Sequence, residues 1–475
     1  MAKEISNHIE DNISYFHKTL SVDRNFDIIY RVLYIGDRKS CLYMVDGFTE
    51  GEVIQKLLQS LMGNQPEDIP ENAHELSKKL LPYGEIGLAK DADTAIRMLL
   101  MGFTLLFVDG YDQAITIDCR SYPVRSVEEP DKDRVLRGSR DGFVETLVFN
   151  TALIRRRIRD PHLIHEIMQV GDSSATDIAI CYMQGRADET LLETIKNRLK
   201  NLRVDSLTMN QESLAECIYP HKWYNPFPKF KYTERPDTTA ACLLEGSIVL
   251  MVDNSPAAMI LPSSIFDIIE EANDYYFPPI TGTYLRFSRF LAFLMAIFLT
   301  PAFLLVVSMP DILPQWLRFI LPKEYVNVPF LWQFLILEFA TDGLKLAAVN
   351  TPNMLTTPLS VIAGVIIGDF SVSSGWFNAE TMLYMSFVIL ANYTQTSMEL
   401  SYALKFMRII MLLLTAAFQG WGFAIGVVFV FSAILFNRTI AGQNYLYPLY
   451  PFNGKEFLRR FFRMRIPHTW ENQEK

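Results

Sequence analysis

Three ionisable residues stand inside a stretch that is otherwise apolar enough to cross a lipid bilayer. The stretch is Phe330–Asn350, and the residues are Glu338, Asp342 and Lys345. At about 100° per residue, the three positions fall within roughly 60° of one another on one face of a helix. A charge at the bilayer centre costs at least ~2.5 kcal/mol. This face is therefore predicted to point at a protein interior or at water, and not at lipid.

The spacing of these residues leaves two interpretations open. Glu338 and Lys345 can pair through Asp342, which would make a polar seam that holds helices or subunits together. Alternatively the same face lines an ion path, which is the default interpretation of ionisable groups inside a membrane. Asp369 and Glu399 add acidic groups at other depths, and acidic positions repeated around an axis form rings that select cations. We therefore expect Glu338, Asp342, Asp369 and Glu399 to be ion-path residues, with Lys345 as their charge partner.

The part of the chain before the first apolar stretch carries no recognisable catalytic pattern. The P-loop, HExxH, CxxC and GxSxG patterns do not occur. His162 and His165 lie near Glu166 and could suggest a metal site, but no cysteine or second histidine cluster accompanies them, so a solvated helix start is favoured. The sequence therefore predicts no enzyme activity, no metal and no cofactor.

Charge is divided unevenly along the 475 residues. Residues 1–285 hold 30 Lys and Arg against 43 Asp and Glu, and residues 286–475 hold 14 against 10. The acidic first part argues against a nucleic-acid partner. Five widely spaced cysteines precede the apolar stretches, which is typical of reduced thiols in the cytosol: Cys41, Cys119, Cys181, Cys217 and Cys242.

The first part is predicted to be a mixed α and β domain in two parts. Hairpins are expected within Phe26–Val45 and across Thr104–Asp118, a helix at Gly142–Arg159, and a strand pair around Gly246 within Ala240–Val252. The basic run at 155–157 lies among acidic residues, which favours internal or intersubunit ion pairs.

The second part is predicted to be an all-α membrane domain of four to six passes. Phe290–Met309 has twenty residues without a charge, enough to span a ~30 Å core. Pro358–Asp369 is a short apolar piece, and Met382–Leu404 is expected to be a full span. Ile409–Phe436 is long for one span and short for two, so a broken or re-entrant hairpin bent at Gly420–Gly422 is an alternative.

Basic residues near the span ends predict the orientation. Arg286 and Arg289 hold the first span's entry inside, Lys405 and Arg408 mark another cytoplasmic turn, and the tail is basic. Both termini are thus expected in the cytoplasm. The predicted divisions are an amphipathic helix at 1–24, α+β subdomain 1 at 25–135, α/β subdomain 2 at 136–285, the transmembrane domain at 286–437 and a basic cytoplasmic tail at 438–475.

Several long motifs resemble the A subunits of the GerA-type spore germination receptors. The resemblance runs from about Phe26 to the end of the chain and is carried in the first part by Arg125–Leu163, Ser174–Met183, Thr233–Asp237 and Leu243–Ile260. The motifs that point to the SpoVAF branch of the family are Ile280–Phe290, Ala347–Asn353, Gly368–Phe377 and Ile389–Lys405. Ser139 and Asp141 replace the family's usual Pro and Glu. Thr396 and Met398 replace a Pro and a Tyr, which removes the sequence basis for a proline kink beside Glu399.

The resemblance implies a multi-pass protein of the spore inner membrane that acts when germination releases cations and dipicolinic acid. It implies an oligomer, a pentamer, that forms a channel for monovalent cations and works with other germination membrane proteins, with small-molecule sensing left to a separate B subunit. The alternative is a non-conducting scaffold that organises receptor clusters in the lipid membrane. A carrier, the third class, would need internal repeats that the sequence does not show.

Overall fold

A computed structural model describes residues 3–121, 135, 137–219, 224–323, 326–350, 364 and 370–463. The chain forms two compact units. The first comprises residues 1–220 and 230–262, and the second comprises residues 221–229 and 263–475. The predicted piece Pro358–Asp369 lies, apart from Gly364, outside the described residues.

The first unit begins with a five-stranded antiparallel sheet. Its strands, in spatial order, are β1 (Ile28–Ile35), β2 (Arg38–Val45), β4 (Thr104–Val108), β5 (Ala114–Ile117) and β3 (Ile86–Ala89). The hairpins β1–β2 and β4–β5 confirm the two predicted hairpins. Gly36 and Gly110 adopt positive φ angles in the two turns, which is why glycine is suited to both positions.

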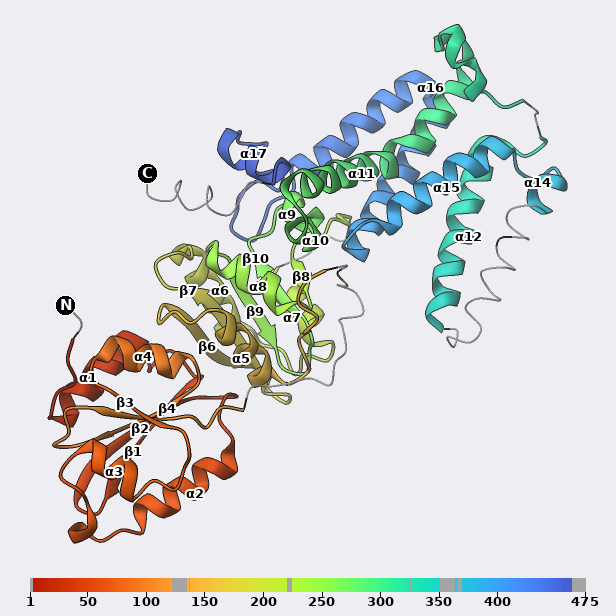
Figure 1. The fold of residues 1–475 in the computed structure, drawn as a ribbon. Helices are drawn as coiled ribbons and strands as arrows, with labels where there is room; N and C mark the ends of the chain where they lie inside the picture. Colours follow the sequence, from red (N-terminus) through yellow and green to blue (C-terminus); the bar gives the residue numbers. More distant parts are fainter. Residues whose placement is uncertain are drawn as a thin grey trace. The chain divides into compact units, whose positions relative to one another are not determined.

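Four helices cover this sheet, two on each face (Figure 1). They are α1 (Ile9–Leu20) and α4 (Ala92–Leu100) on one face, and α2 (Gly51–Met62) and α3 (Ala73–Lys79) on the other, with a short 3-10 turn η1 at Pro66–Asp68. Each helix carries apolar residues at helical spacing, such as Ile9, Phe16 and Leu20 in α1, and buries that side against the sheet. This burial of apolar surface is the main stabilising contribution to the sheet.

A second antiparallel sheet completes the first unit. Its order is β6 (Leu163–Val170), β7 (Thr176–Met183), β9 (Ile248–Val252), β10 (Ala258–Leu261) and β8 (Lys231–Thr233), with helices α5 (Leu147–Arg157), α6 (Glu189–Asn201), α7 (Asn210–Ile218) and α8 (Pro236–Leu244). The mixed α and β character of the first part is thereby confirmed. The strand pair expected around Gly246 is wrong, because Pro236 sets the first turn of a helix that continues to Leu244, and Gly246 then turns the chain into β9.

Buried polar contacts join the second sheet to the segment before β1. The guanidinium of Arg155 lies 2.8 Å from the Asp27 carboxylate, and both side chains are 1% exposed. This pair confirms the prediction of ion pairs for the basic run. The helix start expected at His162–Glu166 is wrong, because residues from Leu163 onward form β6 and pair with β7, so that His165 lies opposite Cys181.

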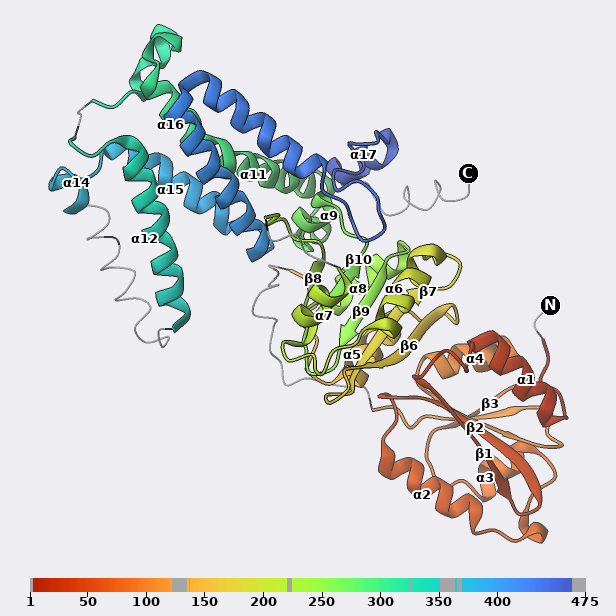
Figure 2. The same ribbon diagram turned by 180° about the vertical axis from the view of Figure 1, so that it is seen from behind.

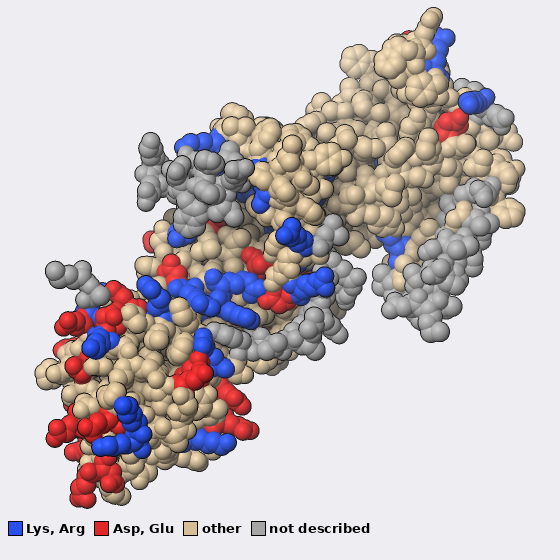
Figure 3. Space-filling model, in the orientation of Figure 1, with Lys and Arg blue, Asp and Glu red and all other residues tan. Residues whose placement is uncertain are grey.

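The second unit consists almost entirely of helices within its described residues. They are α9 (Ile265–Ile269), α10 (Asn273–Tyr276), α11 (Pro279–Ser308), η2 (Pro310–Ile312), η3 (Gln315–Ile320), α12 (Phe330–Asn350), α14 (Ser371–Ser373), α15 (Ala379–Tyr393), α16 (Met398–Leu435) and α17 (Gly454–Phe461). Among the described helices, α11 and α16 are long and apolar enough to cross a membrane. Figure 3 shows few charged side chains over this unit and many over the first.

The expected single span Met382–Leu404 is wrong, because two helices occupy this stretch. Helix α15 ends at Tyr393 and α16 begins at Met398. The Ser397 side chain accepts a hydrogen bond from the backbone N–H of Leu400, which caps the new helix, and the Thr396 hydroxyl donates to the Ile268 carbonyl. The break therefore forms without the proline that the family usually has here.

Helix α16 reverses direction at Gln419, whose φ of 51° and ψ of −126° are not helical. Both halves of α16 are visible in Figure 2. Gly422 of the second half approaches the Leu414 carbonyl of the first half so closely that a Cβ atom there would collide, and Gly426 packs against Met411. The hairpin bent at Gly420–Gly422 is therefore confirmed, and small residues permit its close packing.

Candidate functional site

The polar face of α12 meets the first half of α16 in the interior of the second unit, which we call the helical unit. The Arg408 guanidinium forms an ion pair with the Glu338 carboxylate through its Nε atom. The Arg408 side chain is 0% exposed and that of Glu338 is 5% exposed. This is a fully desolvated contact between two helices, in which charge-assisted hydrogen bonding offsets the cost of burying both groups.

A second cation, Lys405, lies between the two carboxylates. Its Nζ atom forms an ion pair with Asp342, lies 3.8 Å from Glu338 Oε2 and donates to the Glu338 carbonyl at 3.2 Å. The i, i+4 spacing of the two acids and the i, i+3 spacing of the two bases place each pair on one helical face. We call Glu338, Asp342, Lys405 and Arg408 the charge cluster, and its formal charges balance.

The charge cluster lies within the apolar part of the unit and not at its end. Arg408 also donates through Nη1 to the carbonyl of Ala296 in α11, about 9 Å along the helix from Phe290. Met309 at the other end of α11 packs on Gly420, so α11 and the first half of α16 run parallel. Apolar side chains enclose the region, including Phe334 and Leu337 of α12.

Lys345, the expected charge partner, points to aromatic rings. Its ammonium lies 5.3 Å from the ring centre of Tyr393 and 5.4 Å from that of Tyr402. Both distances are within the range of cation–π attraction. The carboxylates Glu338 and Asp342 are paired with Lys405 and Arg408 of α16, and not with Lys345 of their own helix.

The structure does not bring all five predicted residues together. Glu399 is exposed in the first turn of α16, about 9 Å along the helix axis from Lys405, where its charge suits the helix N-terminus. Asp369 lies outside the described residues. Glu338 and Asp342 thus form one site, Lys345 lies beside it, and Glu399 is separate from it.

The sequence prediction missed the basic half of the charge cluster. Lys405 and Arg408 were expected to mark a cytoplasmic turn, which is wrong, because both lie inside α16 with buried side chains. Their i, i+3 spacing within an apolar helix was the signal that could have identified them. Like the i, i+4 spacing of the two acids on α12, it places both side chains on one face of the helix, so the two charged faces can pair.

Several buried polar atoms around the charge cluster have no hydrogen-bond partner within the described part of the chain. They include Arg408 Nη2, Thr300 Oγ1 of α11 and Thr415 Oγ1 of α16. Buried polar groups of this kind are ordinarily satisfied by ordered water. The arrangement can hold charge and water inside an apolar helical unit, and it offers no activated nucleophile.

The histidine cluster of the first unit does not converge on a metal. The His165 Nδ1 atom lies 3.2 Å from Cys181 Sγ, whereas Glu166 forms ion pairs with Arg24 and Lys196 and His162 pairs with Asp160. Burial lowers the pKa of His165 to about 4. Across the described ranges, no group of three or more His, Cys, Asp or Glu side chains is placed to hold a metal ion.

Comparison with known proteins gives consistent relatives over nearly the whole chain. The family described as Bacillus/Clostridium GerA spore germination protein matches residues 14–475. Stage V sporulation protein AF of Bacillus subtilis (strain 168) is 36% identical over 458 residues, which cover 96% of this chain and 92% of that protein. Uncharacterized membrane protein YfkQ of the same organism is 26% identical over 466 residues, which cover 97% of this chain and 90% of that protein.

A solved structure is also similar. The N-terminal domain of the A subunit of the Bacillus megaterium spore germinant receptor GerK3 has 26% sequence identity and a TM-score of 0.42, and the match covers 55% of this chain and 97% of that one. The relatives and the two apolar helices point to a membrane location. Given a family match over 462 of its residues and a relative at 36% identity, the chain belongs to the GerA family of spore germination proteins.

Proposed function

We propose that the chain is an oligomeric, cation-channel-forming subunit of the spore inner membrane that promotes ion release during germination. The observation that supports this function is the charge cluster, which holds two carboxylates inside apolar helices. Charges at membrane depth are costly and are rarely retained without a role in transport or assembly. A channel subunit also needs no catalytic residues, and we propose that the chain is not an enzyme.

The two carboxylates differ in a way that assigns them different roles in a channel. The Asp342 side chain is 29% exposed, against 5% for Glu338. Asp342 is therefore the carboxylate that a permeating ion can reach, while Glu338 and Arg408 fix α12 to α16. A monovalent cation carries the same charge as the Lys405 ammonium, so it can replace that group beside Asp342 without changing the local charge.

A non-conducting scaffold is the second candidate function, and one observation favours it. Both carboxylates already have cationic partners in the same chain. A cluster that is charge-balanced within one protomer can act as a seam between helices, without any ion path. The two functions differ in what happens when a carboxylate is removed, because a seam is needed for assembly and a path is needed for conduction.

Conductance of the purified oligomer in planar bilayers tests the proposal. The wild-type protein should give discrete cation currents, and Asp342→Asn should lower them while the oligomer keeps its size in gel filtration. Asp311→Asn, the same chemical change at an exposed position in η2, is the matched control. Equal currents from the two variants would reject Asp342 as part of a cation path. Silence of a well-folded wild-type oligomer would mean either a missing partner or a scaffold, and co-purification would separate the two. Loss of assembly in Asp342→Asn would favour the scaffold.

The remaining features of the proposal follow from the family and the charge distribution. We place both termini in the cytoplasm and expect the subunits to assemble as a pentamer with other germination membrane proteins as partners. Asp369 and Glu399 remain proposed path residues, with Lys345 as a charge partner beside the path. Four to six membrane passes remain the expectation for the helical unit.

A further inference from the structure

Helix α17 is fixed against the beginning of α11. The ring of Phe461 stacks on that of Phe290 with centroids 4.6 Å apart, and Phe457 lies next to Phe461 at 4.4 Å. The Arg286 guanidinium donates to the backbone carbonyls of Arg459 and Arg460 at 2.8 and 3.1 Å. The helix is thus held where α11 leads into the charge-free stretch that begins at Phe290.

The acidic groups near α17 are already paired with arginines, of which Arg286 and Arg289 are buried. Asp274 pairs with Arg289 at 2.8 Å, and Glu270 pairs with both Arg286 and Arg460 at 2.8 and 3.0 Å. Two further carboxylates of α9 and the loop after it are bound in the same way, by Arg460 and Arg289: Asp267 and Glu271. These contacts set three arginines against four carboxylates, so together they leave only one negative charge beside α17.

The outward side of α17 and its flanks keep a positive charge. Lys455 is exposed, and Arg459 is about one-third exposed and faces the similarly exposed Glu456 at 3.1 Å. Arg463 donates to the carbonyls of Phe277 and Tyr275, which do not neutralise it. Lys455 and Arg459 thus face one carboxylate on the outward side, and Arg463 beside them adds a third positive charge that no carboxylate in these contacts offsets.

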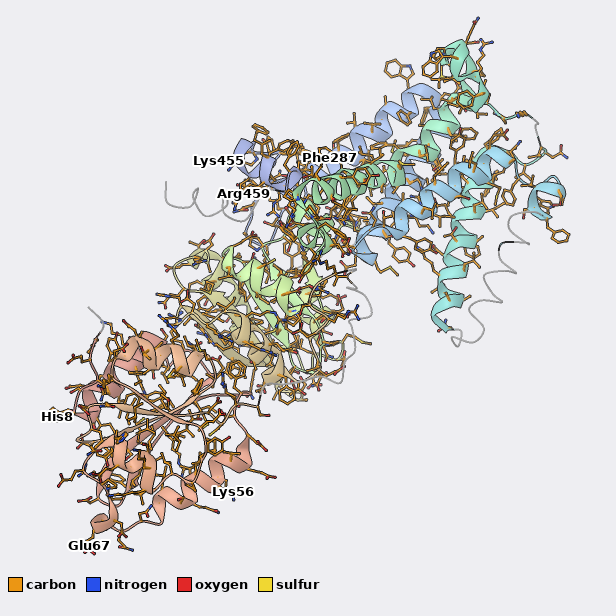
Figure 4. The ribbon with its side chains drawn as sticks, in the orientation of Figure 1. His8, Lys56, Glu67, Phe287, Lys455 and Arg459 are labelled. Atoms are coloured by element: carbon orange, nitrogen blue, oxygen red, sulfur yellow. The ribbon has the colours of Figure 1, made fainter. Side chains whose placement is uncertain are left out.

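Large apolar side chains surround these cations. Phe452 is 70% exposed, and Phe287, Leu458 and Phe462 are each close to half exposed. Figure 4 shows Phe287, Lys455 and Arg459 gathered at the end of the helical unit where α17 packs. Exposed rings next to exposed cations are the pattern of helices that lie in the headgroup region of a bilayer, with the apolar side in the acyl boundary.

We propose that α17 and the beginning of α11 form a binding site for anionic phospholipid headgroups, in the leaflet where α11 enters the membrane. Lys455 and Arg459 would contact the lipid phosphate, and Phe287, Phe452, Leu458 and Phe462 would contact the upper acyl chains. Charge complementarity selects an anionic lipid, and continuity with the apolar surface of α11 selects a lipid over a free phosphate. The proposal needs only a membrane location and does not depend on ion conduction.

Native mass spectrometry of the full-length protein in detergent micelles tests the site. The probes are dioleoylphosphatidylglycerol, dioleoylphosphatidylcholine and inorganic phosphate, titrated separately. Lys455→Ala combined with Arg459→Ala should weaken phosphatidylglycerol binding by about fivefold for each charge removed and leave phosphatidylcholine binding unchanged. These substitutions keep the backbone carbonyls that Arg286 contacts, so the helix should remain in place.

The matched control combines Lys56→Ala in α2 with Lys78→Ala in α3, two exposed lysines of the first unit. This control should bind both lipids as the wild type does. Phe452→Ala with Leu458→Ala should weaken both lipids to the same degree, because it removes apolar contact and no charge. The proposal would be overturned if the wild type bound the two lipids with equal affinity, or if it bound phosphate as tightly as phosphatidylglycerol. It would also be overturned if the control variant with Lys56→Ala and Lys78→Ala weakened phosphatidylglycerol binding as much as the variant with Lys455→Ala and Arg459→Ala. The proposal would also be overturned if the variant with Lys455→Ala and Arg459→Ala lost a co-purifying membrane protein but still bound lipid as the wild type does, because the surface would then bind a protein.

Discussion

Replacement of Arg408 by methionine should destabilise the helical unit because it leaves two buried or half-buried carboxylates, Glu338 and Asp342, to share the single cation Lys405. The Glu338 side chain is 5% exposed, and its remaining partner, the Lys405 ammonium, lies 3.8 Å from Oε2. Removing one member of a buried ion pair costs about 3–5 kcal/mol, and an uncompensated charge at membrane depth costs at least ~2.5 kcal/mol. We expect Arg408→Met to lower the free energy of unfolding by about 3 kcal/mol.

A double variant separates the charge penalty from lost packing. Glu338→Leu with Arg408→Met removes both charges and should cost far less than either single substitution, since replacing a whole buried pair by apolar groups is often close to neutral. Urea unfolding in detergent micelles, followed by tryptophan fluorescence, reports on the helical unit because Trp332, Trp376 and Trp421 all belong to it. Lys56→Met, at an exposed site of the first unit, should change stability by less than about 0.5 kcal/mol.

The outcome that refutes this reasoning is additivity. If the double variant loses the sum of the two single losses, Glu338 and Arg408 stabilise the protein independently and their contact is not the source of the effect. If Arg408→Met alone is as stable as the wild type, then Glu338 is not an ionised side chain buried against Arg408.

Two further predictions concern pH and the α16 hairpin. Burial lowers the pKa of His165 to about 4, so the unfolded chain binds its proton first and stability should fall by up to ~3 kcal/mol as pH drops from about 6.5 to 4. Thermal unfolding followed by circular dichroism at a series of pH values should show that His165→Phe removes most of that loss, whereas His8→Gln, at an exposed position, does not. If the stability of the wild type and of both variants fell in parallel with pH, this prediction would be contradicted. Gly422→Val should collide with the Leu414 carbonyl and prevent the hairpin, whereas Gly343→Val, whose Cβ meets open space, should express and fold. Equal yields of monodisperse protein from both glycine variants would show that close approach at Gly422 is not required.

The parts of the fold that the sequence predicted are those that local chemistry decides. Hairpin turns at Gly36 and Gly110 follow from residues that favour positive φ angles, and the long apolar helix α11 follows from twenty residues without charge. The reversal near Gly420 follows from an apolar stretch too long for one span and interrupted by glycines. Each of these features depends on neighbouring residues and needs no partner from elsewhere in the chain.

The parts that failed depend on partners far away in sequence. The burial of Lys405 and Arg408 depends on two acidic residues more than sixty positions earlier in the chain. The rule that basic residues mark the cytoplasmic ends of spans does not consider such partners, so it wrongly predicted a turn at these residues. The strand at His165 depends on pairing with β7, and the break before Met398 depends on a hydroxyl that reaches the Ile268 carbonyl. Tertiary contacts outweighed local preference in all three cases.

The contact between Arg286 and the last helix also constrains how the protein is made. The carbonyls that receive the Arg286 guanidinium belong to residues 173 and 174 positions later in the chain. During synthesis, α11 is made before α17, and its arginine lacks these two acceptors until residues 459 and 460 have been added. The contact between α11 and α17 therefore forms late in the folding of the helical unit, and a chain cut short before α17 would leave Arg286 and Phe290 without these partners.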